Sequence, residues 1–224
     1  MKKEKHWKDH FKYYDFFQNH FSKYRKLILL YAKYLKNKRK ILDSGCGTGN
    51  LTLELLKQKH NVVAIDLNKF GLNVLRKKCK KYSKNLKVHR MDVEKIKFRN
   101  NSFDGVSSFF VVPFVKNNKE YFSEVYRVLR NNGKFVISIP SSKNLKGVIE
   151  IFERELKKKK ILPKFKKEWG QFLKTTKVNE SKALKGPPLR KIKNMLKKIG
   201  FTKIRSLKNP YKNHVYFIVC EKCQ

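Results

Sequence analysis

The segment ILDSGCGTGN, residues 41–50, places Gly45, Gly47 and Gly49 at alternate positions directly after a short apolar run. A loop of this kind brings backbone amides close to a small ligand. A phosphate-binding Walker loop needs Lys-Ser/Thr after its last glycine, whereas Asn50 and Leu51 follow here. A dinucleotide loop needs its third glycine at position 50, which is asparagine. The spacing therefore excludes both of these loops.

Asp43 lies two residues before the first glycine and narrows the choice of ligand. Its carboxylate would repel a pyrophosphate but favour a cofactor that carries an ammonium group. S-adenosylmethionine has an ammonium group, and its carboxylate suits the backbone amides at a helix N-terminus. The loop therefore favours S-adenosylmethionine as the cofactor.

Two further acids end apolar runs in the same way, Asp66 after residues 61–65 and Asp92 after residues 86–91. An acid at the end of the second strand can accept hydrogen bonds from two ribose hydroxyls. Asp92 would reach the adenine amino group, with the backbone of Val93 at a ring nitrogen. Because Asp also favours turns, an ordinary role at strand ends is the alternative interpretation of these acids.

Strand-like and helix-like segments alternate from residue 39 to residue 140. The strand-like runs are 39–45, 61–66, 86–92, 102–112 and 134–140, and the helical patterns are 50–60, 70–83 and 118–133, the last ended by Gly133. This alternation predicts an α/β fold with a mostly parallel sheet and helices on both faces. The carboxyl ends of parallel strands share one edge, where ligands bind.

The flanking segments complete a single domain, residues 1–224. Residues 1–37 form an aromatic-rich cap of one or two helices, and residues 38–140 form the cofactor-binding core. Residues 141–186 interrupt the alternation as an insertion on the substrate side, with one helix at about 145–158. Residues 187–224 read as a closing helix that ends at Gly200, followed by a β-hairpin.

Five segments, ILDSGCGTGNLT, VVAIDLN, HRMDVEKIKF, NSFDGVSSFFVV and EVYRVLRNNGKFVIS, resemble in order the motifs of class I S-adenosylmethionine-dependent methyltransferases. The ubiquinone/menaquinone-biosynthesis branch, of the methyltransferase type 11-like kind, is the most similar. The resemblance implies a Rossmann-like three-layer sandwich whose seven-stranded, mostly parallel sheet has one antiparallel strand. It implies a cofactor site made by Asp43, Gly45, Cys46, Gly47, Gly49, Asp66, Leu67, Asp92, Val93 and Ser108.

The sequence departs from this family at two places. Pro113 and Phe114 stand where many relatives have a His-His or His-Trp pair, so no role for that histidine can be transferred. The turn before the fifth strand is Asn131-Asn132-Gly133 in place of Pro-Gly-Gly, which is compatible with the fold because Asn tolerates a left-handed conformation.

The net charge of +39, from 56 Lys and Arg against 17 acids, would suit an anionic partner such as RNA or the surface of an anionic membrane. Enrichment in Lys, Asn, Ile, Phe and Tyr would also follow from A/T-rich codons, so the charge alone does not identify a partner. No apolar run is long enough to span a bilayer, and the N-terminus lacks the pattern of a secretory signal. The four cysteines are scattered, with one isolated CEKC pair, so we expect no metal site and a reduced, cytoplasmic protein.

The sequence contains few signals that identify the methyl acceptor. Tyr14, His10, His20 and His6 are candidate catalytic residues on the N-terminal helices, with surface or packing roles as the alternative. Trp169 and Phe172 suit either an acceptor pocket or a small core of the insertion. Because the Asn/Asp-Pro-Pro-Tyr/Phe motif of base-methylating enzymes is absent after the fourth strand, we expect a small or lipophilic acceptor. RNA, a protein acceptor and a catalytically silent cofactor-binding protein remain alternatives.

Overall fold

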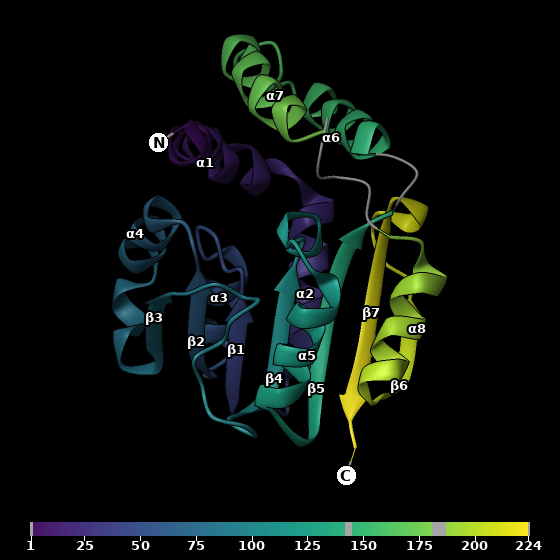
Figure 1. Ribbon diagram of the computed structural model, residues 1–224. Coiled ribbons are helices and arrows are strands. Elements are labelled where there is room, and N and C mark those ends of the chain that lie inside the picture. The colour runs from purple at the N-terminus through teal and green to yellow at the C-terminus, as the bar shows by residue number, and fades with distance from the viewer. Residues whose placement is uncertain (1, 142–144, 181–186, 224) are drawn as a thin grey trace.

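The computed structural model describes residues 2–141, 145–180 and 187–223, without side chains at 2–9, 145–148 and 176–180. It contains a seven-stranded sheet in the order β3-β2-β1-β4-β5-β7-β6 (Figure 1). The strands are β1 (Lys40–Ser44), β2 (Asn61–Asp66), β3 (Leu86–Arg90), β4 (Phe103–Phe109), β5 (Leu129–Pro140), β6 (Phe201–Leu207) and β7 (Val215–Lys222). β7 pairs antiparallel with both β5 and β6, and the pairings among β1 to β5 are all parallel. The predicted sheet with one antiparallel strand is confirmed.

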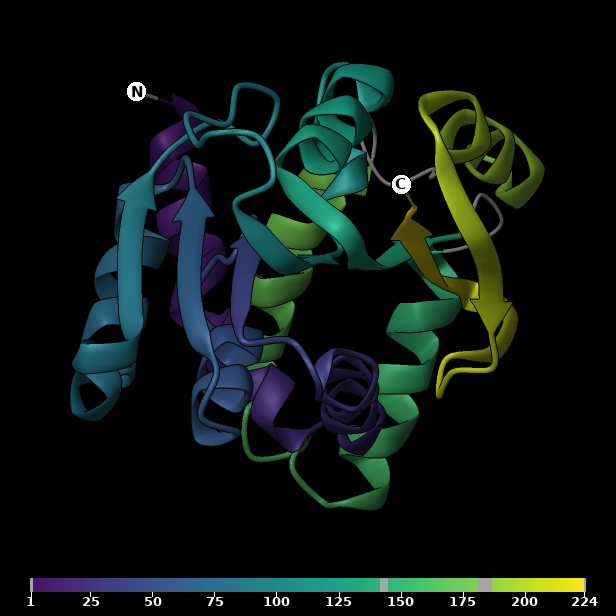
Figure 2. The ribbon, with the colours of Figure 1, turned by 90° about the horizontal axis from the view of Figure 1, so that it is seen from below.

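Helices cover both faces of this sheet (Figure 1, Figure 2). One face packs against α2 (Ser22–Leu35), α3 (Asn50–Lys57) and α4 (Lys69–Lys78), and the other against α5 (Asn118–Val128) and α8 (Leu189–Ile199). Alternate residues of β2 enter the two cores, since Val62 and Ala64 belong to the first and Val63 and Ile65 to the second. A strand that is buried on both faces needs a continuous apolar run, which explains the sequence NVVAI.

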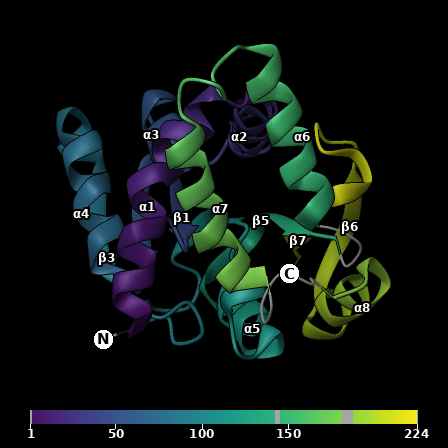
Figure 3. The same ribbon diagram turned by 90° about the horizontal axis from the view of Figure 1, so that it is seen from above.

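Three helices lie over the carboxyl edge of the parallel strands (Figure 3). They are α1 (Lys2–His20), α6 (Leu145–Lys158) and α7 (Lys166–Glu180). Short 3-10 helices at Lys80–Asn85, Val112–Phe114 and Lys212–His214 complete the described elements. The insertion thus contains two helices where the sequence predicted one, because the pattern of α7 was too weak to recognise.

The predicted end of α5 at Gly133 is wrong. The helix ends at Val128, and Leu129 already pairs with Phe103 in the sheet. Asn101 N and Ser102 N donate to the carbonyls of Arg127 and Val128, so these carbonyls bond to a neighbouring loop instead of continuing the helix. The chain then bulges through residues 130–133, where Asn132 has a φ of 61°, as expected for a left-handed asparagine.

Candidate functional site

A cavity of about 650 Å³ lies at the carboxyl edge, between the strand ends and the covering helices. Eight of the ten predicted cofactor residues line it: Asp43, Gly45, Cys46, Gly47, Asp66, Leu67, Asp92 and Val93. The topology explains this convergence, since β1, β2 and β3 are parallel neighbours and their last residues meet at one edge.

Gly49 and Ser108 are not among the lining residues of the cavity. Gly49 forms the N-cap of α3 with a φ of 82°, so its left-handed backbone sets the turn from the loop into the helix. Ser108 is fully buried, and its carbonyl accepts a 2.6 Å hydrogen bond from the Tyr31 hydroxyl. The next residues along the chain, Phe109 and Phe110, line the cavity instead.

The glycine loop follows a sharply turned path between β1 and α3. Gly45 has a φ of 72°, and a Cβ atom there would lie 2.4 Å from Val111 Cγ2. The amides of Gly45 and Cys46 both donate to the Ile65 carbonyl, at 2.8 and 3.0 Å. A side chain at position 45 would therefore meet both backbone strain and a direct clash. Cys46 is half-buried, and desolvation raises the pKa of its thiol well above the ordinary value, so the neutral thiol is favoured.

Asp66 closes one side of this loop. Its Oδ2 accepts from Gly47 N at 2.9 Å and its Oδ1 from Asn68 N at 2.8 Å. Burial raises the pKa of the carboxyl, and the hydrogen bonds from Asn68 and Gly47 oppose that rise. Each oxygen keeps a second lone pair, so the carboxylate can still accept hydrogen bonds from a ligand.

Asp43 is almost completely buried, with 1% of its surface exposed. Burial raises its pKa to about 6, against the hydroxyl groups of Thr52 and Ser107, which donate to the carboxylate at 2.5 and 2.8 Å. An ionised carboxylate in this position is a strong local source of negative potential. The site can therefore stabilise a positive charge in the cavity.

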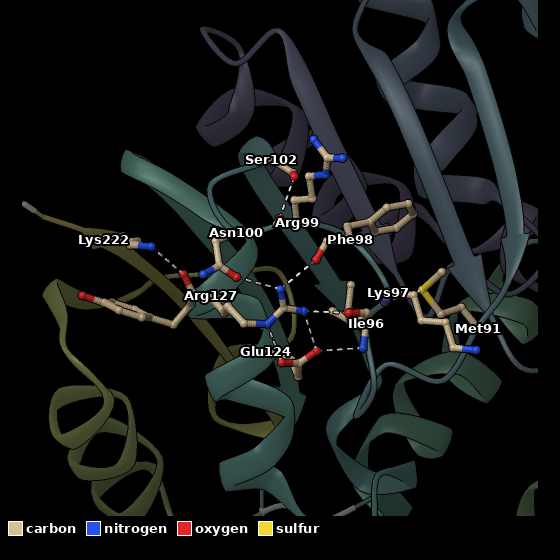
Figure 4. A network of polar contacts seen from close by, with 11 residues as sticks. Met91, Ile96, Lys97, Phe98, Arg99, Asn100, Ser102, Glu124, Arg127 and Lys222 are labelled. Carbon is tan, nitrogen blue, oxygen red and sulfur yellow. Dashed lines mark hydrogen bonds and ion pairs between the residues drawn. The ribbon is translucent and has the colours of Figure 1, made fainter.

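Asp92 lies two residues beyond the end of β3, where its Oδ1 accepts from Glu94 N at 2.9 Å. The loop that follows is held by Arg127 of α5, which donates to the carbonyls of Ile96 and Phe98 at 2.6 and 2.7 Å (Figure 4). The Arg127 guanidinium also pairs with Glu124, whose carboxylate accepts from Ile96 N (Figure 4). This network fixes one wall of the cavity from behind.

The α1 helix forms the opposite wall. His10, Tyr14 and Gln18 line the cavity at a spacing of four residues, one turn apart on the same side of the helix. His10 Nδ1 lies 3.2 Å from Thr175 Oγ1, and burial raises the pKa of Tyr14 to about 12. His20 is not at the cavity, and its Nδ1 lies 2.6 Å from the Phe16 carbonyl. A catalytic role of His20 thus stays a prediction that the cavity lining does not support, and the side chain of His6 lies outside the described residues.

Asp15 joins α1 to the glycine loop, a role that the sequence analysis missed. Its Oδ1 accepts from Thr48 Oγ1 at 2.6 Å and from Asn50 Nδ2 at 3.0 Å, and its Oδ2 pairs with Lys78 Nζ at 2.7 Å. Lys78 also donates to Asn50 Oδ1 at 2.6 Å. No local pattern marks Asp15, because its partners are 33 to 63 positions away along the chain.

Aromatic side chains fill the part of the cavity under the insertion. Phe172 of α7 lines the cavity, whereas Trp169 packs behind it against Phe17 and Phe21. Trp169 therefore belongs to a core that the insertion shares with the N-terminal helices, and an acceptor-binding role of Phe172 stays a prediction. Phe114, at the position where relatives carry the second residue of a histidine pair, also lines the cavity.

Two negative observations apply to the described part of the chain. Residues 2–141, 145–180 and 187–223 contain no group of three His, Cys, Asp or Glu side chains that could hold a metal ion. No helix among them is long and apolar enough to cross a membrane.

Comparisons with known proteins agree with this geometry. Residues 42–137 match the methyltransferase domain family. A ubiquinone/menaquinone biosynthesis C-methyltransferase from Blochmanniella floridana is 30% identical over 189 residues, which cover 80% of this chain and 72% of that protein. The protein of the same name from Wigglesworthia glossinidia brevipalpis is 31% identical over 135 residues, 57% of this chain and 54% of its own length. This chain therefore spans about half of the second relative.

A solved structure, Haemonchus contortus phosphoethanolamine N-methyltransferase 2 in complex with S-adenosyl-L-methionine, has a similar fold. Its TM-score is 0.62 at 18% identity, covering 88% of this chain and 52% of that one. The fold that the sequence motifs implied is thereby confirmed. The family match across the core and the 30% identity to a curated methyltransferase lead to one conclusion: this chain belongs to the class I S-adenosylmethionine-dependent methyltransferases, with S-adenosylmethionine as its cofactor.

Proposed function

We propose that the cavity holds S-adenosylmethionine against the ends of β1, β2 and β3 and a small, lipophilic methyl acceptor beneath α1, α6 and α7. The observation that carries this proposal is that strand ends and covering helices line one cavity with different chemistry. Asp43, Asp66 and Asp92 come from the strand ends, and the aromatic Phe152 and Phe172 come from α6 and α7. We therefore assign the cofactor to residues 38–140, with Phe11 and Asp15 of α1 beside its loop, and the acceptor to the covering segments 1–37 and 141–186.

The donor set fits the cofactor. Asp66 has lone pairs left for two ribose hydroxyls, and the buried Asp43 favours the ammonium group. Asp92 and Val93 line the same cavity, which supports a contact of Asp92 with the adenine amino group and of the Val93 backbone with a ring nitrogen. Gly45, Gly47, Gly49, Cys46 and Leu67 shape the loop and the walls around it, and Ser108 supports the sheet below.

The cofactor, when bound, supplies an activated methyl group on a sulfonium. The protein contributes position and exclusion of water, because α1 covers the cavity and Asp15 ties that helix to the glycine loop. Tyr14 and Tyr24 keep their protons near neutral pH, since burial raises the pKa of both hydroxyls. Both hydroxyls are therefore protonated when the acceptor binds and can serve as hydrogen-bond donors.

The acceptor class is supported by the lining and by the relatives. None of the described cavity residues contributed by the covering helices is Lys, Arg, Asp or Glu. They are His10, Phe11, Tyr14 and Gln18 of α1, Tyr24 of α2, Ile149 and Phe152 of α6, and Phe172 of α7. A phosphate-rich acceptor such as RNA would need basic side chains at this place. The relatives named as ubiquinone/menaquinone biosynthesis and demethylmenaquinone methyltransferases suggest a quinone-type aromatic ring.

The cofactor half is tested with Asp66→Ala. We expect this substitution to weaken binding of S-adenosylhomocysteine at least about tenfold in calorimetry, because it removes the acceptor of the ribose hydroxyls. Asp104→Ala is the matched control, since Asp104 is a carboxyl outside the cavity. Unchanged binding in the Asp66 variant would contradict the ribose assignment.

The acceptor half is tested by transferring labelled methyl groups from S-adenosylmethionine into a cell extract. The extract is then separated into RNA, protein, lipid and small-molecule fractions. We expect the label in the lipid or small-molecule fraction, with little dependence on salt. Label in RNA that falls steeply as salt rises would refute the proposal, because phosphate contacts depend strongly on ionic strength.

A further inference from the structure

Gln18 presents a polar group that the fold leaves unused. The side chain is 6% exposed and lines the cavity, and its Oε1 has no hydrogen-bond partner among the described residues. A buried oxygen without a donor destabilises a folded protein. Eight buried side-chain atoms of the described residues lack a partner, and Gln18 is the one residue among them that lines the cavity. The position of Gln18 therefore points to a bound group.

The position of Gln18 on α1 places it toward the acceptor. At one end of this stretch, Phe11 lies close to Gly47 and Gly71, beside the cofactor loop. At the other end, Phe17 packs on Trp169 and Phe21 stacks on Phe152 at a centroid distance of 3.9 Å. Gln18 thus lies near α6 and α7, at the aromatic end of the cavity.

The polar groups near Gln18 are already engaged. The hydroxyls of Tyr14 and Tyr24 lie 3.4 Å apart, and the Tyr24 hydroxyl accepts from Asn50 Nδ2 at 3.1 Å. His10 Nδ1 lies 3.2 Å from Thr175 Oγ1. These neighbouring polar side chains all have hydrogen-bond partners, whereas the Gln18 amide oxygen has no donor among the described residues.

We propose that the Gln18 amide binds a hydroxyl or N–H group on the methyl acceptor, and that the acceptor is an uncharged aromatic molecule that carries this group. This inference rests on the proposed function and adds the residue that orients the acceptor. The aromatic lining holds the apolar ring, and the single amide fixes how the ring turns within the cavity. Gln18 is therefore a specificity-determining residue and takes no proton in the reaction.

The test compares two probes that differ by one hydroxyl group, 2-naphthol and naphthalene. Their dissociation constants are measured by ligand-detected NMR on the full chain saturated with S-adenosylhomocysteine. We expect the wild-type protein to bind 2-naphthol about threefold to tenfold more tightly than naphthalene, the range of one neutral hydrogen bond. In the Gln18→Leu variant, the dissociation constants of 2-naphthol and naphthalene should agree within about twofold.

Stability separates a binding role from a structural one. Gln18→Leu replaces an unpartnered polar group by an apolar one of similar size, so its melting temperature should equal or exceed that of the wild type. Ser138→Ala is the matched control, because Ser138 Oγ is also buried without a partner but does not line the cavity. This control should keep the preference for 2-naphthol.

Three results would overturn the inference while leaving the cofactor site intact. They are equal binding of both probes by the wild type, no binding of 2-naphthol to protein that binds S-adenosylhomocysteine, and a Gln18→Leu variant that melts lower yet keeps the preference. Failure of the wild type to bind S-adenosylhomocysteine would instead refute the proposed cofactor site.

Discussion

Replacing Asp43 by asparagine should make this protein more stable and at the same time a poorer binder of its cofactor. Burial raises the pKa of Asp43 from 3.8 to about 6, which is a shift of about 2 units. At about 1.4 kcal/mol per unit, keeping this carboxyl ionised in the folded chain costs about 3 kcal/mol at neutral pH. An asparagine side chain would have the same shape and could still bond the hydroxyls of Thr52 and Ser107 without that cost.

The pH dependence has a definite sign. Between about pH 4 and pH 6 the folded protein keeps the Asp43 proton and the unfolded chain has lost it, so unfolding releases a proton. The wild-type free energy of unfolding therefore falls in this window as the pH rises. Asp43→Asn lacks this titration, so the variant should gain up to about 3 kcal/mol on the wild type by pH 7 and nothing near pH 4.

Urea unfolding of both proteins across this pH range measures the effect. S-adenosylhomocysteine at one fixed, excess concentration should then stabilise the wild type more than the variant, because stabilisation by a ligand grows with the logarithm of its concentration divided by its Kd. Asp104→Asn is the control, because the pKa of Asp104 is shifted in the opposite direction. Burial alone would raise this pKa, but the hydrogen bonds from Lys40 N and Arg130 outweigh burial, so the pKa is lowered overall. This control should lose stability at neutral pH and recover it relative to the wild type in acid.

A pH-independent loss of stability in Asp43→Asn would refute this reasoning. It would mean that the hydrogen bonds of the carboxylate outweigh the cost of burying its charge. Equal stabilisation of both proteins by S-adenosylhomocysteine would refute the assignment of Asp43 to the ammonium group.

Three further substitutions test the supports of the site. Gly45→Ala should cost roughly 2–4 kcal/mol in urea unfolding, because its Cβ would lie 2.4 Å from Val111 Cγ2; Gly170→Ala, in open space on α7, should be neutral or stabilising. Asp15→Ala should speed amide exchange in α1 and weaken S-adenosylhomocysteine binding, with α5 exchange unchanged, since α1 loses its ties to the loop. Arg127→Lys should cost roughly 1–3 kcal/mol in urea unfolding, because Lys cannot reproduce the forked contacts. Protection of α1 that survives Asp15→Ala, or full stability of the Arg127 variant, would show that these contacts are dispensable.

Much of the core could be predicted because its signals are local. The run NVVAID forms β2 over the residues predicted, since a strand buried on both faces must be apolar throughout. The convergence of the acids near the ends of β1, β2 and β3 could also be predicted, because neighbouring parallel strands bring their carboxyl ends to one edge of the sheet. The prediction failed at the end of α5, where tertiary bonds to the carbonyls of Arg127 and Val128 overrode the signal of Gly133.

The sequence by itself determined the order of strands and helices along the chain, the glycine loop and the set of acids that identify the cofactor, because each depends on residues within one turn or one strand. Only the tertiary structure decided which residues face the acceptor. Gln18 and Asp15 lie on an amphipathic helix that predicts burial equally well against many surfaces, and His20 sits on the same helix without reaching the cavity. Their roles depend on how α1 packs over strand ends that are distant in sequence, and no local pattern encodes that packing.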